Sequence, residues 1–216
     1  MPDVSLKKLI TVPALITLAI TLLRLVGELM HWSPVLFNRA AGGAGAIVGI
    51  AWLVPVFGVY FAVKLAGAGE RPSGAGPAIG LPLLGVLLVP LAALVTNKLG
   101  MGRQSIATFG VFIVAAIIGA LIALRGWPAL GRTLLAYGLA ARIPVVIVML
   151  IAMLGNWGTH YDVAPPGFPA MGVIQKWFMI GVLPQMTLWL WFTIALGALC
   201  GGITAAVKGE RRPVTA

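Results

Sequence analysis

Six long apolar segments, separated by short stretches rich in charge, glycine and proline, constrain this chain more than any other feature of its sequence. A helix that crosses the hydrocarbon core of a bilayer needs roughly 20 apolar residues. Transmembrane β-strands would be about ten residues long and alternate in polarity, and the sequence lacks that pattern. We therefore predict an all-α integral membrane protein, a single domain over residues 1–216 with about six transmembrane helices. The predicted spans are 9–30, 44–63, 77–96, 105–124, 133–154 and 178–204.

The composition agrees with a membrane protein. Only 9% of the residues are charged and 60% are hydrophobic, whereas a soluble domain carries about 25% charged residues. The formal net charge of +10 does not indicate nucleic acid, because lysine and arginine gather in the loops of membrane proteins, near lipid headgroups. We expect the lipid bilayer as a partner, no nucleic acid, and as further candidate partners other membrane subunits or a homo-oligomer.

The basic residues are distributed unequally between the two sides of the predicted spans. Nine lie on one side, four on the other, and Arg24 and Arg142 lie within spans. The positive-inside rule assigns the richer side to the cytoplasm. We therefore predict that both termini are cytoplasmic and that the protein resides in the cytoplasmic (inner) membrane of a bacterium. The richer side holds Lys7, Lys8, Lys64, Arg71, Arg125, Arg132, Lys208, Arg211 and Arg212, and the other holds Arg39, Lys98, Arg103 and Lys176.

A polar stripe runs along the first predicted span. Thr17, Thr21, Arg24, Glu28 and His31 follow one another at intervals of 4, 3, 4 and 3 residues, which places them within an arc of roughly 80° on one helix face. Because charge inside a bilayer is costly, this face should contact protein or water and not lipid. With the N-terminus inside, the charged half of the stripe lies in the outer half of the membrane.

Other segments bring polar residues to a similar depth. Arg142 falls near the middle of the fifth span, Gln185 lies in the outer half of the sixth, and the loop between them holds His160 and Asp162. We predict that these groups form one polar site that opens outward. The candidate ligand-binding residues are Arg24, Glu28, His31, Arg142, His160, Asp162 and Gln185.

Two interpretations of this site remain open. Two intramembrane arginines face one intramembrane carboxylate, and the surplus positive charge would suit a phosphate, a carboxylate or an anionic lipid headgroup. Asp162 folding back from the loop would reduce that surplus. Alternatively, Glu28 joins Arg24 and Arg142 in a buried triad that fixes helix register and does no chemistry.

Three functions follow from these interpretations. The first is a helical bundle that binds or transports a small, anionic or lipid ligand; the second is a non-catalytic subunit or scaffold of a larger complex. The third is a lipid-modifying membrane enzyme with Glu28 or His160 as acid or base, but no catalytic motif supports it and we assign no catalytic residue. We expect no metal or cofactor, because Cys200 is the single cysteine and the two histidines lack a metal-binding spacing.

Glycines four residues apart occur in two predicted spans, at Gly45 and Gly49 and at Gly197 and Gly201. Such pairs let neighbouring helices approach closely. In a chain with 28 glycines, however, this spacing also arises often by chance, so it does not by itself predict helix contacts.

Overall fold

The computed structural model describes residues 5–43, 45–102 and 105–209, and throughout this part of the chain the regular secondary structure is helical. Five helices there are long and apolar enough to cross a membrane, which confirms a helical protein of membrane type. They are α1 (Leu6–Leu29), α3 (Ala75–Lys98), α4 (Ile106–Gly126), α5 (Pro128–Gly155) and the helical run Val173–Gly209. Of the basic residues counted for orientation, Arg103, Arg211 and Arg212 lie outside the described residues.

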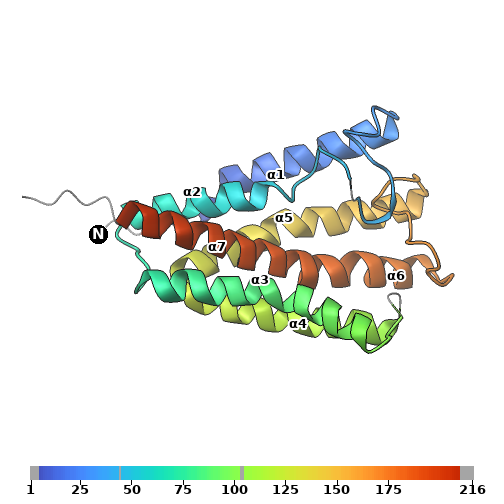
Figure 1. Ribbon diagram of the computed structural model, residues 1–216. Coiled ribbons are helices and arrows are strands. Elements are labelled where there is room, and N and C mark those ends of the chain that lie inside the picture. Colours follow the sequence, from blue (N-terminus) through green and yellow to red (C-terminus); the bar gives the residue numbers. More distant parts are fainter. Residues whose placement is uncertain (1–4, 44, 103–104, 210–216) are drawn as a thin grey trace, which may run out of the picture.

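The second predicted span differs from the structure. Helix α2 (Leu53–Gly67) has 15 residues, and the described chain between α1 and α2 is non-helical apart from the short turn η1 (Ala41–Gly43). Position 44, the predicted start, lies outside the described residues, and the expected helix over 45–52 is wrong. Gly42, Gly43 and Gly45 adopt φ values of 73°, 68° and 83°, which belong to the left-handed region and interrupt a right-handed helix. The segment 45–52 then leads to α2, which begins midway along the bundle (Figure 1).

The last predicted span is longer and less regular than expected. Helix α6 (Val173–Lys176) continues into the π-helical turns η2 (Trp177–Val182) and η3 (Gln185–Trp189) and then into α7 (Leu190–Gly209). Pro184 lies between the two π-helical turns. Proline has no backbone N–H and cannot close a regular helical hydrogen bond, and π-helical turns widen the backbone at such places. The predicted range 178–204 lies inside this helical run.

Helix α7 occupies the centre of the bundle (Figure 1) and packs against α2, α3, α4 and α5, whereas α1 packs mainly against α5. Helices approach closely at Gly197 and Gly201. A Cβ atom on Gly58 would collide with the carbonyl oxygen of Gly197, and one on Gly201 would lie 3.0 Å from the carbonyl oxygen of Gly58. The pair Gly45 and Gly49 precedes α2 and is not part of a helix. An added Cβ on Gly49 would lie 3.1 Å from Nη1 of Arg24.

The connections after α1, α3 and α5 all lie at one end of the bundle (Figure 1). We call this the distal end. The first turn of α1 and the last turn of α7 lie toward the opposite end (Figure 1). The distal end gathers the loops that the sequence singles out for polar residues.

Candidate functional site

The polar stripe of α1 faces the protein interior, as its spacing predicts. Thr17, Thr21, Arg24 and Glu28 are all buried, and Glu28 is 0% exposed. The hydroxyl group of Thr17 lies 2.8 Å from that of Tyr137 on α5, so the stripe packs on that helix. His31 is the exception. It follows the end of α1 with a φ of 54°, is exposed, and its ring Nδ1 lies 3.0 Å from the carbonyl oxygen of Leu29.

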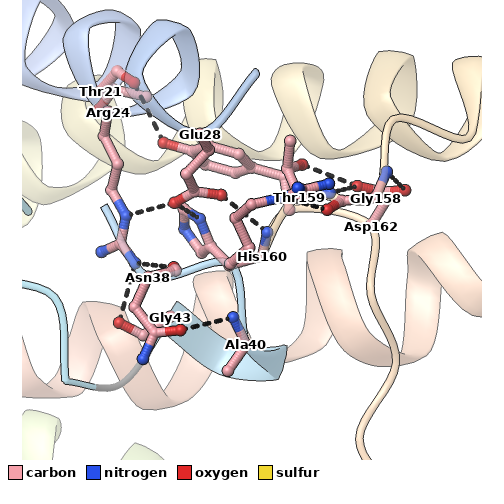
Figure 2. Close-up of polar contacts among 12 residues, drawn as sticks. Thr21, Arg24, Glu28, Asn38, Ala40, Gly43, Gly158, Thr159, His160 and Asp162 are labelled. Carbon is pink, nitrogen blue, oxygen red and sulfur yellow. Dashed lines mark hydrogen bonds and ion pairs between the residues drawn. The ribbon is translucent and has the colours of Figure 1, made fainter. Parts of the chain in front are cut away.

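Glu28 is the centre of a buried polar cluster (Figure 2). Its Oε1 accepts a hydrogen bond from Arg24 Nε at 2.8 Å and lies 2.5 Å from the ring Nδ1 of His160. Its Oε2 accepts from the backbone N–H of His160 at 2.9 Å. The carboxylate thereby fixes both the backbone and the ring of His160 against α1.

Arg24 also ties α1 to the chain that follows it. Its Nη2 donates to the carbonyl oxygens of Asn38 at 3.1 Å and Gly43 at 2.9 Å (Figure 2). An added Cβ on Gly43 would lie 2.7 Å from this Nη2 and 2.6 Å from the ring Cδ2 of His160. The glycine thus leaves room for both side chains. The charge of Arg24 is balanced by Glu28, and its Nε and Nη2 donate to three acceptors.

The loop that carries His160 is held by Asp162. Its carboxylate accepts from the backbone N–H groups of Gly158 at 2.8 Å and Thr159 at 2.7 Å, and from the Thr159 hydroxyl group at 2.7 Å (Figure 2). Arg39 Nε donates to the carbonyl oxygen of Gly158 at 2.8 Å. Asp162 therefore organises its own loop.

Tyr161 adds a second tie between the loop and α1, because its hydroxyl group donates to the carbonyl oxygen of Thr21 at 3.1 Å. Burial raises the pKa of Tyr161 above its ordinary value, so the phenol stays protonated as this hydrogen bond requires. Burial likewise lowers the pKa of His160 below 6.5, and the charge of Arg24 lowers it further against the opposing effect of Glu28. A neutral imidazole that donates from Nδ1 to Glu28 fits this environment.

Arg142 lies apart from this cluster. It is 3% exposed, and its Nη1 lies 3.4 Å from Gln185 Oε1, a long hydrogen bond. Its guanidinium carbon lies 5.0 Å from the centre of the Trp189 ring, and its Nε has no hydrogen-bond partner within the described structure. Among the described residues, no carboxylate forms an ion pair with Arg142. The triad of Arg24, Glu28 and Arg142 is therefore not formed there, and His160 occupies the place expected for Arg142.

A cavity of about 1160 Å³ opens at the distal end. Its walls come from α1, residues 42–43 and 45–52, the start of α4, α5, the loop after α5 and the π-helical turns. Four of the seven candidate residues line it: Arg24, Arg142, His160 and Gln185. Glu28 and Asp162 support the wall from behind, and His31 is not part of it.

Trp189 and the carbonyl groups of Asn38 and Gly43 belong to the site, although the sequence did not identify them. Trp189 follows Gln185 by four residues, about one helical turn, and that spacing was a usable signal. The two carbonyl groups carried no such signal, because any residue has one. Within the described ranges, no group of three or more His, Cys, Asp or Glu side chains could hold a metal ion.

Comparison with known proteins gives no information on function, so the evidence is the geometry described above. No protein family, no curated protein and no solved structure was found to match the chain.

Proposed function

We propose that this protein is a multi-pass membrane bundle that binds or transports an anionic ligand, small or lipidic, in the cavity at its distal end. The observation that carries this proposal is Arg142. This residue is only 3% exposed, and it lines the cavity with its Nε unpartnered among the described residues. A cation in this position favours an anion as its counterpart.

The energetic reason is the cost of burying a charge. Removing an ion from water costs several kcal/mol even after the protein relaxes, and a charged or strongly polar partner must offset that cost. The contact with the Trp189 ring offsets part of it, since such cation–π contacts contribute about 0.5–2 kcal/mol. The guanidinium group has five N–H donors, and in the described structure one of them makes a single long hydrogen bond. A carboxylate or phosphate would accept two donors at once.

The other candidate residues take different roles in this proposal. Gln185 lies beside Arg142 and contacts the same ligand. Arg24 and His160 form the opposite part of the wall, and Glu28 positions both of them through its three hydrogen bonds. Asp162 acts on the shape of the loop. His31 takes no part in binding.

Native mass spectrometry of the protein purified in mild detergent tests this proposal, because it detects a retained ligand of any identity. We expect wild type to retain an anionic adduct that Arg142→Gln loses. Arg132→Gln is the matched control, because Arg132 is exposed near the start of α5, at the other end of the bundle. Circular dichroism and size-exclusion chromatography establish that both variants are folded.

The outcomes separate the alternatives. An anionic adduct retained by Arg142→Gln as firmly as by wild type would contradict the proposal. A protein that co-purifies stoichiometrically in place of a small adduct would favour the subunit or scaffold function. An adduct chemically altered by wild type and unaltered in Glu28→Gln would favour a membrane enzyme.

The proposal includes six spans, with both chain ends in the bacterial cytoplasm. The nine basic residues predicted on that side, against four on the other, support this orientation. Helix α2 is about 22 Å long and covers only part of a hydrocarbon core of about 30 Å. The non-helical segment 45–52 supplies the remainder, and such backbone is tolerated at membrane depth where it lines a cavity.

A further inference from the structure

Resting on the proposed function, we infer that the ligand is an amphiphilic anion. Its carboxylate or phosphate head lies on Arg142 and Gln185, and its hydrocarbon tail lies along the apolar wall of the same cavity. Three independent features support a long apolar ligand over a small hydrophilic anion: the size of the cavity, the chemistry of its wall and the chemistry of its rim.

The cavity is larger than a small anion requires. Its volume is about 1160 Å³, whereas pockets for drug-sized ligands measure roughly 300–1,000 Å³. An inorganic phosphate or an acetate would fill a small part of it next to Arg142. The remaining volume would then hold either water or a much larger portion of the same ligand.

The wall beyond the arginine side chains favours the second possibility. Apolar side chains of several segments line it, among them Phe109, Met149, Phe168, Met179 and Ile180. Methionine adapts its shape to irregular apolar partners. A hydrophilic ligand would lose its hydrogen bonds to water against this wall without regaining them, which is costly. A hydrocarbon tail has no such loss.

The rim of the cavity also carries exposed apolar side chains. Ile47, Trp52 and Ile106 line the cavity and are 61%, 52% and 81% exposed, respectively. Exposed apolar surface of this kind marks contact with a membrane or with an apolar ligand. A lipid-like molecule that reaches the cavity from the bilayer would keep its tail on apolar surface along the whole path.

Binding of defined probes to the detergent-purified protein tests this inference. The probes are palmitate and hexadecyl phosphate, uncharged hexadecanol with the same chain, and acetate and inorganic phosphate without a chain. Scintillation proximity with radiolabelled probes measures saturable binding, and empty micelles supply the blank. Each probe is applied to wild type, Arg142→Gln, Arg142→Lys, Ile180→Trp and the control Arg132→Gln, all checked for folding by circular dichroism.

We expect palmitate or hexadecyl phosphate to bind once per protein, at least tenfold more tightly than hexadecanol and at least 100-fold more tightly than acetate or phosphate. Whichever of the two binds more tightly identifies the head group. Arg142→Gln lowers the affinity for the long-chain anion at least tenfold, and Arg142→Lys, which keeps the charge, lowers it less. Ile180→Trp narrows the apolar part of the cavity and lowers the affinity for the long-chain anion, although Arg142 is unchanged. Arg132→Gln matches wild type.

Each contrary result has a separate meaning. Acetate or phosphate that binds as tightly as the long-chain anion, and depends on Arg142, would overturn the amphiphilic ligand and leave the proposed anion site standing. Hexadecanol that binds as tightly as the tighter of the two long-chain anions would overturn both, because the charge of Arg142 would then have no role. Absence of saturable binding by every probe to folded wild type would also overturn both.

Discussion

The carboxylate of Glu28 binds both the backbone N–H and the imidazole ring of His160, although 132 residues separate the two positions in the chain. One oxygen accepts from the backbone N–H of His160 at 2.9 Å, and the other lies 2.5 Å from the ring Nδ1. This contact docks the loop after α5 onto the end of α1. It also sets one wall of the cavity that Arg142 lines from the other side.

Replacing Glu28 should destabilise the protein strongly. Glu28→Gln leaves the buried Arg24 without its counterion, and breaking such a pair costs about 3–5 kcal/mol. We expect a loss of about that size in the free energy of unfolding, measured by denaturation in mixed micelles. Glu70→Gln serves as the control, because Glu70 is exposed, and it should change stability by less than about 0.5 kcal/mol. Equal effects of the two substitutions would refute the role of the cluster.

The stability of the docked loop should depend on pH through His160. Its pKa in the folded protein lies below the ordinary value of 6.5, because burial, the largest effect, and the charge of Arg24 together outweigh the hydrogen bond and the charge of Glu28, which raise it. The unfolded state then binds the proton more readily. This contribution to stability is therefore present above about pH 6.5 and is lost as the pH falls through the folded pKa.

We expect the melting temperature of wild type to fall between pH 7 and pH 5, and His160→Gln to remove part of that dependence. His31→Gln is the matched control, because His31 is exposed and lies outside the cluster. Asp162 also acts on His160 through its charge. An unchanged pH profile in His160→Gln would contradict this assignment.

Arg142 should favour ligand binding but lower the stability of the ligand-free protein. Arg142→Met removes a buried charge that lacks a counterion among the described residues and keeps an unbranched side chain in its place. We expect the ligand-free protein to gain about 1–2 kcal/mol, because the substitution removes the cost of keeping an uncompensated charge out of water, which is several kcal/mol per ion, and loses only the contacts with Gln185 and Trp189. Arg24→Met, which breaks the ion pair with Glu28, should instead destabilise. A loss of stability in Arg142→Met would mean that the arginine holds the fold together.

Gly58 should be intolerant of any side chain. A Cβ atom there would collide with the carbonyl oxygen of Gly197 on α7, and backbone can relieve the collision only by separating α2 from α7. Gly58→Ala should cost about 1–3 kcal/mol, the usual range for overpacking. Gly80→Ala is the control in α3, where an added Cβ meets no described atom within 4 Å, and it should stabilise by about 0.5–1 kcal/mol. Unfolding in mixed micelles distinguishes the two.

Cysteine labelling in intact cells checks the predicted orientation. In a Cys200→Ala background, Ala170→Cys lies in the loop after α5 and Ser73→Cys lies between α2 and α3, and both positions are exposed. A maleimide that cannot cross the membrane should label Ala170→Cys at once and Ser73→Cys only after lysis. The reverse pattern would invert the topology and place the cavity on the cytoplasmic side.

Hydropathy and helical periodicity predicted much of this fold. The spans around α1, α3 and α4 need only a long apolar run, and the stripe on α1 needs only the 3.6-residue period. Hydropathy wrongly predicted a helix for the segment before α2, because Gly42, Gly43 and Gly45 count as neutral or apolar residues in a hydropathy profile. The sign of φ, and not the polarity of the side chain, excludes a helix there.

The site was harder to predict than the fold. The residues Arg24, Arg142, His160 and Gln185 were found by their polarity at a common depth. Their pairing was not, because both arginines are equally suited to Glu28 by charge. The choice depends on how the loop after α5 folds back, and the loop is fixed by Asp162 through backbone N–H groups that no sequence pattern reports.

The spacing of Arg24 and Glu28 has a consequence for how the chain enters the bilayer during synthesis. Helix α1 emerges long before His160 has been made, so in the proposed topology Glu28 enters the lipid without the partner that later holds its second oxygen. The guanidinium group four residues earlier on the same helix is already present, and a pair at this spacing closes within one helix. The ion pair thus lets the first helix carry its charges into the membrane alone, before the loop that completes the cluster has been made.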